Sequence, residues 1–158
     1  VPYFSEINLA ARAWVSEWGR ILKQGALLLI DYGFPQREYY HPQRAEGTLM
    51  CHYRHHAHGD PFWLPGLNDI TAHVDFTAAA SAGHDAGLDV LGYTSQARFL
   101  LNCGLLDLLH GADARTVAYA QKLINEHEMG ELFKVIGFVR GPAFDAIGFA
   151  HGDRCHTL

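Results

Sequence analysis

The amino-acid sequence predicts an α/β fold built on an open sheet, and two neighbouring segments carry that prediction. Apolar residues recur at mostly three- and four-residue steps from about residue 5 to residue 23, which indicates an amphipathic helix. The following segment, ALLLIDYG at residues 26–33, begins with five consecutive apolar residues. Such a run is typical of a strand covered on both faces in a parallel sheet. A helix followed by a strand of this kind is the repeating unit of doubly wound sheets.

The composition limits the classes of protein to which the chain can belong. A length of 158 residues is typical of one domain with a core of its own. The 12 basic and 17 acidic residues give a net charge of −5, which argues against nucleic acid as a partner. No apolar run approaches the roughly 20 residues of a membrane span, so we expect no membrane partner. The cysteines form no CxxC pair and are typical of a reduced, cytosolic protein.

The first helix and strand have recognisable boundaries. Ser5 is a good N-cap for the helix, and Gly25 is expected to end it. The strand ends at Asp31, Tyr32 and Gly33, and in open α/β sheets ligands bind beyond the carboxyl ends of the strands. Asp31 therefore has two interpretations, as a residue that caps the turn or as a residue of a binding site.

Residues 34–74 form a long connection rich in proline, glycine, histidine and aromatic residues, with one short strand predicted at residues 47–53. A connection of this length is usually functional or disordered, and its aromatic content favours order. Tyr39, Tyr40 and Arg44 either contact a substrate peptide or anchor the loop on the core. The histidines at positions 52, 55, 56 and 58 match no zinc-ligand pattern, and the adjacent Cys51 and His52 would point to opposite faces of a strand. We therefore predict surface histidines and no metal site.

A short polar segment precedes the next predicted helix, which runs from residue 75 to about residue 86. In the stretch LPGLNDITAHVDF, five polar side chains fall within eight residues: Asn68, Asp69, Thr71, His73 and Asp75. Asp75 directly precedes the helix and suits an N-cap. Asp69, with Thr71 two residues later, suits either an Asx-type turn or a site. We expect the first four of these polar residues to be the better site candidates.

The remainder of the chain alternates helices and strands. Residues 88–94 predict a strand, Ser95 caps a helix that ends near Gly104, and residues 105–109 add a further turn. Asp113 caps another helix that extends to about residue 126. KVIGFVR at residues 134–140, a Gly141-Pro142 turn and FDAIGFA at residues 144–150 predict an antiparallel hairpin.

Four blocks of sequence closely resemble the MidA-like family of class I S-adenosylmethionine-dependent methyltransferases: LLLIDYGFPQREYYHPQRAEGTLMCHYRHH, PGLNDITAHVDF, GYTSQARFLLNCG and MGELFKV. The mitochondrial member of that family is a complex I assembly factor that methylates an arginine of a protein subunit. The resemblance covers essentially the whole chain. It implies a Rossmann-like sheet of which this chain supplies the C-terminal part, with strands five, seven and six as neighbours and a helical insertion.

The same resemblance implies that residues 1–158 form a single domain and a fragment. The chain starts at Val1 in the manner of a cut through a longer protein, and family members carry a glycine-rich cofactor loop in an N-terminal half. No G-x-G leads from a predicted strand into a helix, so S-adenosylmethionine is expected to need the missing half, and the fragment alone is expected to be inactive. Without strands one to four, the strand at residues 26–31 would be an exposed apolar edge, which favours a homodimer or another pairing through it. The expected location is the cytoplasm of a bacterium, or the mitochondrion of a eukaryote.

The resemblance also suggests roles for the polar residues, because in that family the loop after strand five lies beside the transferred methyl group. An arginine nucleophile would need carboxylates that accept its N–H groups. Asp31 and Asp69 are therefore the candidate catalytic residues. The candidate substrate-binding residues are Tyr32, Gly33, Tyr40, Asn68, Thr71, His73 and Asp75. The expected partner is a protein substrate. The alternative is a non-enzymatic module whose aromatic loop binds a protein, with these polar groups splayed to solvent.

Overall fold

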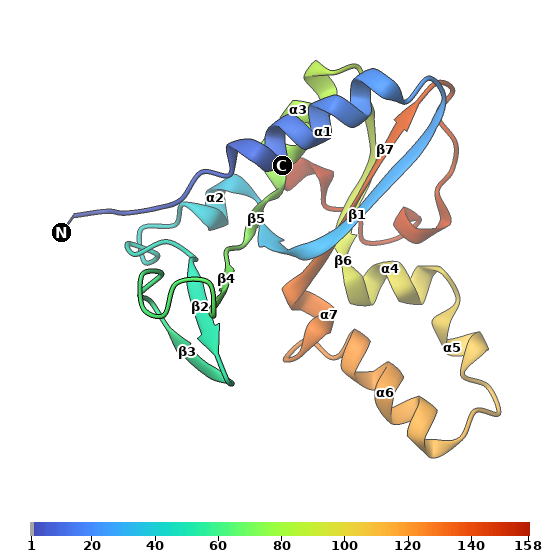
Figure 1. Cartoon of the computed structure of the whole chain (residues 1–158). Helices are drawn as coiled ribbons and strands as arrows, with labels where there is room; N and C mark the ends of the chain where they lie inside the picture. The colour runs from blue at the N-terminus through green and yellow to red at the C-terminus, as the bar shows by residue number, and fades with distance from the viewer. Residues whose placement is uncertain (1) are drawn as a thin grey trace.

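A four-stranded sheet runs through the middle of the molecule, and the computed structural model describes it within residues 2–158. In chain order its strands are β1 (Gly25–Phe34), β5 (Val74–Asp75), β6 (Asp89–Ser95) and β7 (Phe133–Arg140). On one side of the sheet lie α1 (Leu9–Ile21) and α3 (Phe76–Asp85) (Figure 1). On the other side lie α4 (Gln96–Asn102), α5 (Leu105–Leu108), α6 (Ala114–Ile124) and α7 (Met129–Leu132). None of the helices within residues 2–158 is long and apolar enough to cross a membrane.

The strand order is β5-β1-β7-β6, and the longest pairing joins β1 to β7. These two strands are antiparallel from Gly25↔Arg140 to Tyr32↔Phe133. On its other edge β1 pairs in parallel with β5 at only two positions, next to its end. Residues 25–32 of β1 therefore have no neighbour on that edge among the described residues, and this open edge faces the viewer in Figure 1.

Only one face of β1 is covered, so the prediction of a strand buried on both faces was wrong. Leu27 and Leu29 pack against the core beneath α1 and α3. Leu28 and Ile30, which point to the opposite face, are 47% and 49% exposed. The continuous apolar run is therefore packed on one side only, and the helices on the other side of the sheet, α4 and α7, contact β6 and β7.

The predicted hairpin of β7 with residues 144–150 was also wrong, because β7 pairs with β1 and β6 instead. Residues 144–150 contain a short 3-10 helix, Ile147–Phe149. Gly92 and Gly137 lie opposite each other on β6 and β7, and a Cβ atom at either position would fall within 2.7 Å of the Phe149 ring. The paired glycines thus leave a slot on the sheet that Phe149 fills. A second 3-10 helix, Cys155–Thr157, ends the chain.

Most helix starts agree with the sequence prediction. The side chains of Asp75, Ser95 and Asp113 accept backbone N–H groups at the starts of α3, α4 and α6, as expected of N-caps. The first helix differs, because α1 begins at Leu9 and its cap is Asn8 rather than Ser5. Residues 2–8 precede α1 as an extended segment.

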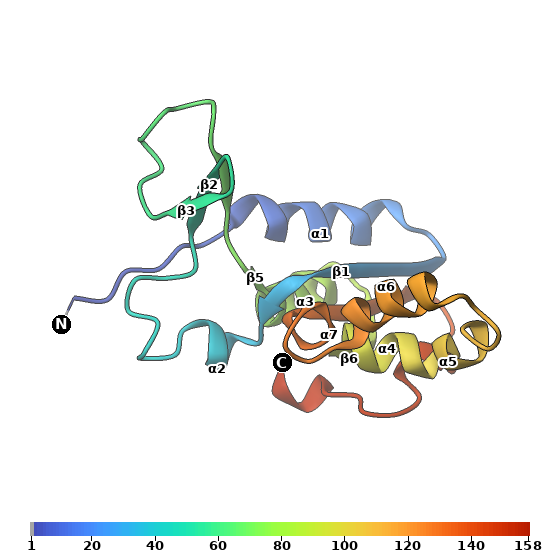
Figure 2. The same ribbon diagram turned by 90° about the horizontal axis from the view of Figure 1, so that it is seen from below.

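The long connection between β1 and β5 is ordered around a second, smaller sheet. After a short helix, α2 (Gln36–Tyr39), it contains β2 (Met50–Tyr53), β3 (His56–His58) and β4 (Asp69–Thr71), which pair in the order β3-β2-β4. We call residues 50–71 the arm, because they project from the body of the molecule (Figure 2). As predicted, Cys51 and His52 point to opposite faces of β2, Cys51 being fully buried and His52 exposed.

Helices α1 and α3 touch at glycine and alanine. A Cβ atom at Gly19 would lie 2.5 Å from the Cβ atom of Ala86, so the two backbones can approach only because position 19 has no side chain. The Arg140 guanidinium then joins the two helix ends, donating to the carbonyl oxygens of Gly19 and, at 2.7 Å, of Ala86. A cation at two helix C-termini is favourable because their last carbonyls are unpaired.

We predict that Gly19→Ala destabilises the fold by about 2 kcal/mol, because α1 must move away from α3. At an exposed position in a helix the same change would stabilise by about 1 kcal/mol. Urea unfolding measures the difference. Gly59→Ala is the control, since a Cβ there meets nothing within 4 Å and its effect should stay within about 0.5 kcal/mol. A Gly19→Ala variant as stable as the control would contradict this account of the helix contact.

Candidate functional site

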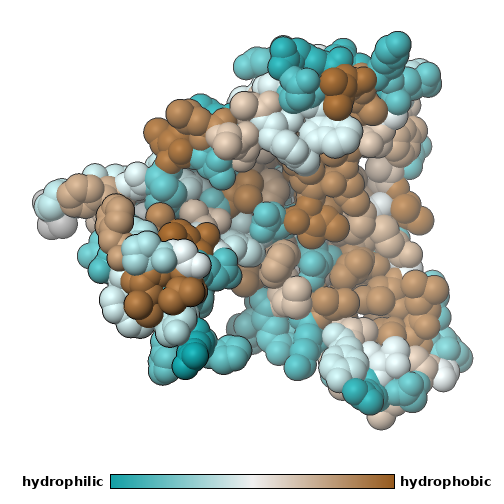
Figure 3. Space-filling view, viewed as in Figure 1, coloured by the Kyte–Doolittle hydropathy of each residue, from teal (hydrophilic) through white to brown (hydrophobic). Residues whose placement is uncertain are grey.

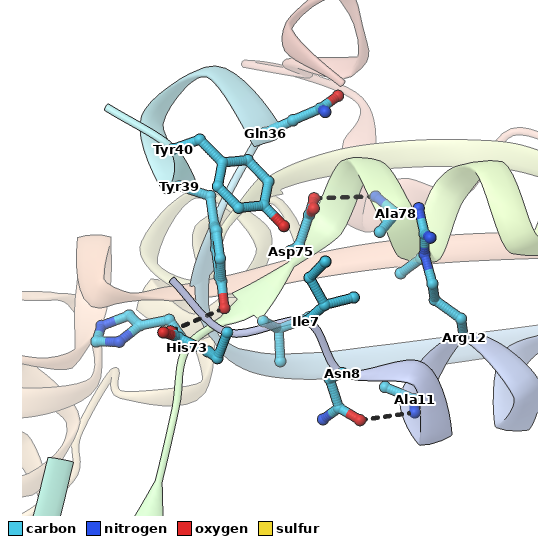
Figure 4. A pocket seen from close by; sticks show the side chains of 13 residues that line it. Ile7, Asn8, Ala11, Arg12, Gln36, Tyr39, Tyr40, His73, Asp75 and Ala78 are labelled. Atoms are coloured by element: carbon cyan, nitrogen blue, oxygen red, sulfur yellow. Dashed lines mark hydrogen bonds between the residues drawn. The ribbon is translucent and has the colours of Figure 1, made fainter. Parts of the chain in front are cut away.

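A cavity lies where three helices begin. Its volume is about 270 Å³, and it is lined by the segment before α1, by α2, and by β5 with the first turn of α3. Its polar lining consists of Glu6, Asn8, Arg12, Gln36, Tyr39, Tyr40, His73 and Asp75. Figure 4 shows Ile7, Tyr40 and Asp75 around the same space, although they come from elements that are far apart in sequence. Three of the predicted site residues, Tyr40, His73 and Asp75, are among them.

Glu6 ties the walls of this cavity together. Its Oε1 atom accepts from the Thr48 backbone N–H (2.8 Å), from the Thr48 hydroxyl and from the Tyr39 hydroxyl (3.0 Å). The Thr48 hydroxyl oxygen in turn accepts from the backbone N–H of His73 (2.9 Å). One carboxylate thus connects the segment before α1 to α2, to the start of the arm and to β5.

Charge and burial shift the pKa values of these groups in the directions that the contacts dictate. Burial alone would raise the pKa of Glu6, but the hydrogen bonds from Thr48 and Tyr39 offset it, and the pKa lies below its ordinary value of 4.5. Burial, together with the nearby Glu6 carboxylate, raises the pKa of Tyr39. At neutral pH Glu6 is therefore an anion and Tyr39 a neutral hydrogen-bond donor.

Asp75 caps a helix and lines the cavity at once. Its Oδ1 atom accepts from the backbone N–H of Ala78 (2.9 Å), which is the expected N-cap bond of α3. Burial and the Asp75 charge raise the pKa of Tyr40, which stands across the cavity. A hydrogen bond from the Gln36 backbone to the Thr77 hydroxyl (2.8 Å) holds the start of α2 against the start of α3. The Asp75 carboxylate thus both caps α3 and lines the cavity.

His73 stands at the inner wall among aromatic rings at the end of β1. It stacks on Phe34 with ring centroids 5.0 Å apart and an angle of 15° between the planes, and it meets the Tyr32 ring edge-on at 5.2 Å. Burial, and then the charge of Arg44, lower the pKa of His73 below its ordinary value of 6.5. Its imidazole is therefore neutral at pH 7.

The remaining predicted site residues lie outside this cavity. Asp31 is exposed on β1, and its carboxylate accepts from the backbone N–H of Tyr32 (2.8 Å), a local bond of the turn-capping kind. Asp69 is exposed on β4, where it pairs with His52 of β2. A Cβ at Gly33 would lie 2.2 Å from the Val74 carbonyl oxygen, so this glycine permits the β1–β5 contact.

Asn68 and Thr71 hold the arm together. The Asn68 side chain donates to the Trp63 carbonyl and bonds to His58 (3.2 Å), and the Thr71 hydroxyl donates to the Met50 carbonyl (3.2 Å). Within residues 2–158, no three His, Cys, Asp or Glu side chains gather closely enough to hold a metal ion.

Sequence reasoning missed Glu6 and Arg12, which line the cavity, and Thr48, which donates hydrogen bonds to Glu6. Nothing local marks them, because Glu6 meets its partners more than 30 positions away along the chain. The one available signal is that Glu6 is an acidic residue within an otherwise apolar opening segment, PYFSEI.

Comparisons with known proteins identify relatives of this chain. Residues 1–94 match the model of a family described as "Putative S-adenosyl-L-methionine-dependent methyltransferase". An uncharacterized protein from Burkholderia thailandensis of known crystal structure is 58% identical, with a TM-score of 0.95 over 99% of this chain and 44% of its own. A second B. thailandensis structure, described as a "likely methyl transferase" bound to S-adenosyl-homocysteine, is also 58% identical, with a TM-score of 0.91 over 98% of this chain and 42% of its own. The chain thus spans less than half the length of either protein. No curated protein matches it.

The described residues do not by themselves fit a nucleoside cofactor of this kind. Such a cofactor needs a glycine-rich turn from a strand into a helix, where backbone N–H groups can approach it. In residues 2–158 the turns from strand to helix contain Pro35 before α2, Asp75 before α3 and Ser95 before α4. Each of them places a side chain, rather than a bare backbone, at the helix start.

We predict that Glu6→Gln destabilises the chain by about 1 kcal/mol at pH 7, because hydrogen bonds to a charged acceptor are replaced by bonds to a neutral one. Glu46→Gln, at an exposed glutamate, is the control and should have no measurable effect. Because the pKa of Glu6 is lowered by folding, its contribution is complete above pH 4.5 and declines as the pH falls through the folded value. Urea unfolding across this pH range should therefore show the two proteins converging in acid. A difference that grew on acidification would contradict the network.

Proposed function

Since the chain belongs to the family described as "Putative S-adenosyl-L-methionine-dependent methyltransferase", we propose that it is part of such an enzyme and forms the substrate-facing side of its active site. The observation that carries the proposal is the likeness, over 98% of this chain, to a protein solved with S-adenosyl-homocysteine bound. The cavity supports it, because it lies at the carboxyl end of β1, where ligands of open α/β sheets bind.

We further propose a protein substrate whose nucleophile is an arginine side chain. A guanidinium presents five N–H donors and needs oxygen acceptors held in fixed positions. Asp75 is such an acceptor, since its place is set by the α3 cap, and Glu6 supplies negative charge beside it. Methyl transfer chiefly requires that the nucleophile is aligned with the methyl group, and acceptors held in place as Asp75 is can align it.

Asp31 and Asp69 remain candidates for orienting the nucleophile, and a different observation supports each of them. Asp31 lies three residues before the end of β1 and is open to solvent. Asp69 lies on the arm, so its contact with a substrate requires one that reaches from the cavity to β4. In this proposal Tyr32, Tyr40 and His73 shape the wall that the substrate meets.

A non-enzymatic interaction module is the second candidate, and the arm favours it. Phe62 is 84% exposed and Leu67 63%, which is unusual for large apolar side chains on an ordered loop. Turns at Asp60–Trp63 and Leu64–Leu67 hold this loop in place. These two functions are compatible if the arm binds the protein that the cavity modifies.

We propose that the open edge of β1 is covered in the working protein, by a further part of the polypeptide or by a second copy. Apolar residues gather on this side of the molecule, over β1 and over α5 (Figure 3). Trp14, Trp18 and Ile21 of α1 are also 36–54% exposed. Seven or more unpaired strand residues flanked by apolar side chains are a ready template for another strand.

Isothermal titration of S-adenosylmethionine tests the proposed function. The full-length B. thailandensis relative should bind it, and the 158-residue chain should bind at least about 100-fold more weakly, because it has no glycine-rich cofactor turn. Comparable binding by the short chain would overturn the assignment of the cofactor to other residues. No binding by either protein would leave the interaction module as the better proposal.

The covered edge has its own test. Replacing both Leu28 and Ile30 by lysine should lower self-association of the 158-residue chain, measured by sedimentation velocity, because the apolar face is lost. The same pair of changes in the full-length relative should lower its melting temperature. Ile147→Lys, at another exposed apolar position, is the matched control. A double variant that associates as the parent does would show that this edge is not the contact.

A further inference from the structure

The cavity at the starts of α1, α2 and α3 is lined by charges of both signs that do not pair with each other. Among its lining residues the carboxylates are Glu6 and Asp75, and Arg12 in the first turn of α1 carries the positive charge. Figure 4 shows Arg12 extending from α1 towards the start of α3, where Asp75 lies. Within residues 2–158 the Arg12 guanidinium forms no ion pair. The way in which each carboxylate is held explains this separation.

Both oxygens of Glu6 are engaged by the walls of the cavity. Its Oε1 atom accepts from the Tyr39 hydroxyl (3.0 Å) and from the backbone N–H and hydroxyl of Thr48. A Cβ atom at Gly47 would collide with Oε2, so this second oxygen packs against the bare backbone there. Glu6 is therefore part of the wall, and turning it towards Arg12 would break the contacts that join α2 to the start of the arm.

Asp75 keeps one oxygen for a ligand. Its Oδ1 atom accepts from the backbone N–H of Ala78 (2.9 Å), which leaves Oδ2 without a hydrogen-bond partner among the described residues. A turn of this carboxylate towards Arg12 would break the cap of α3. The cavity thus presents a fixed, half-buried acceptor at Asp75 and a separate, exposed donor at Arg12, each of them without a partner of opposite charge.

We propose that the cavity takes a bipolar part of a substrate peptide, in which the basic side chain to be modified lies next to an acidic residue. The basic group donates to Oδ2 of Asp75, and the acidic side chain binds the Arg12 guanidinium. The fork of N–H donors on a guanidinium matches the two oxygens of a carboxylate. At about 270 Å³ the cavity lies just below the range of about 300–1,000 Å³ usual for small-molecule sites, which suits side chains better than a whole cofactor.

This inference rests on the proposed function, to which it adds a rule of substrate selection. An enzyme that acts on arginine gains nothing from a cation beside the entering guanidinium, since the two charges repel each other. Arg12 becomes favourable when the substrate brings a carboxylate to it. A substrate with a second basic residue at that place would instead meet Arg12, so the same side chain selects for one neighbour and against the other.

Peptide binding tests the proposal directly. The probes are fluorescent, end-blocked peptides in which one arginine is flanked on both sides by aspartate, asparagine or lysine. A fourth peptide has citrulline, which has the shape of arginine without its charge, between two aspartates. In anisotropy titrations with the 158-residue chain we expect the aspartate peptide to bind about fivefold more tightly than the asparagine peptide, as for a partly exposed ion pair. The lysine and citrulline peptides should bind more weakly still, and high salt should reduce these differences.

Variants of Arg12 assign the preference to this side chain. Arg12→Gln should make the aspartate and asparagine peptides bind equally, and Arg12→Glu should reverse the order, so that the lysine peptide binds more tightly than the aspartate peptide. Arg37→Glu is the matched control, because Arg37 is an exposed arginine of α2 that does not line the cavity, and the variant changes the net charge by the same amount. It should keep the preference for aspartate. Melting curves check that each variant is folded.

The outcomes separate this proposal from the proposed function. Equal binding of the aspartate and asparagine peptides by the parent chain would overturn the role of Arg12, as would an unchanged preference in folded Arg12→Gln. Equal binding of the arginine and citrulline peptides would overturn the role of Asp75. Failure of the proposed function appears elsewhere, as absent S-adenosylmethionine binding in the full-length relative, whatever the peptides do.

Discussion

The antiparallel pairing of β1 with β7 determines where the other parts of the molecule lie. Since the two strands run in opposite directions, the end of β1 lies beside the beginning of β7. This brings α7 and its glutamates next to Phe34 and α2, although about 100 residues separate them in the chain. At the other end of the same ladder, Arg140 reaches the last turns of α1 and α3. A single strand pairing therefore sets both the surroundings of Phe34 and the packing of two helices.

The elements that depend on local chemistry could be predicted from the sequence, and those that depend on distant partners could not. Asp75, Ser95 and Asp113 were identified as caps because a cap bonds to a backbone N–H only three residues away. The partners of β7 depend on contacts across the whole chain, and residues 144–150 have the composition of a strand. Both edges of β7 are already paired, with β1 and with β6, and Phe149 of this segment instead fills the slot above two glycines of β6 and β7. No local pattern announces such a slot.

The candidate site shows the same difference between residues with local partners and residues with distant partners. The polar stretch before α3 was singled out as a candidate site, and the structure places two of its members, His73 and Asp75, in the cavity with Tyr40. The others, Asn68, Asp69 and Thr71, belong to the arm instead. The chain passes from β4 of the arm to β5 of the main sheet within this stretch, so a cluster that is compact in sequence is divided between two parts of the molecule. Glu6 completes the cavity from a segment that no nearby residue could have indicated.

The positions of polar and apolar groups along β1 suggest how assembly and substrate entry avoid each other. Leu28 and Ile30 are exposed in the middle of the strand, whereas Phe34, at its end, stacks on His73 beside the cavity. At about 3.3 Å per residue, the four positions from Ile30 to Phe34 span about 13 Å. A strand added along the open edge would extend the sheet, and a layer packed on Leu28 and Ile30 would cover the apolar face, neither of them crossing that end. The carboxyl end would then remain open on the side of the arm, so the surface that needs a covering partner and the surface that receives a peptide can both be occupied at once.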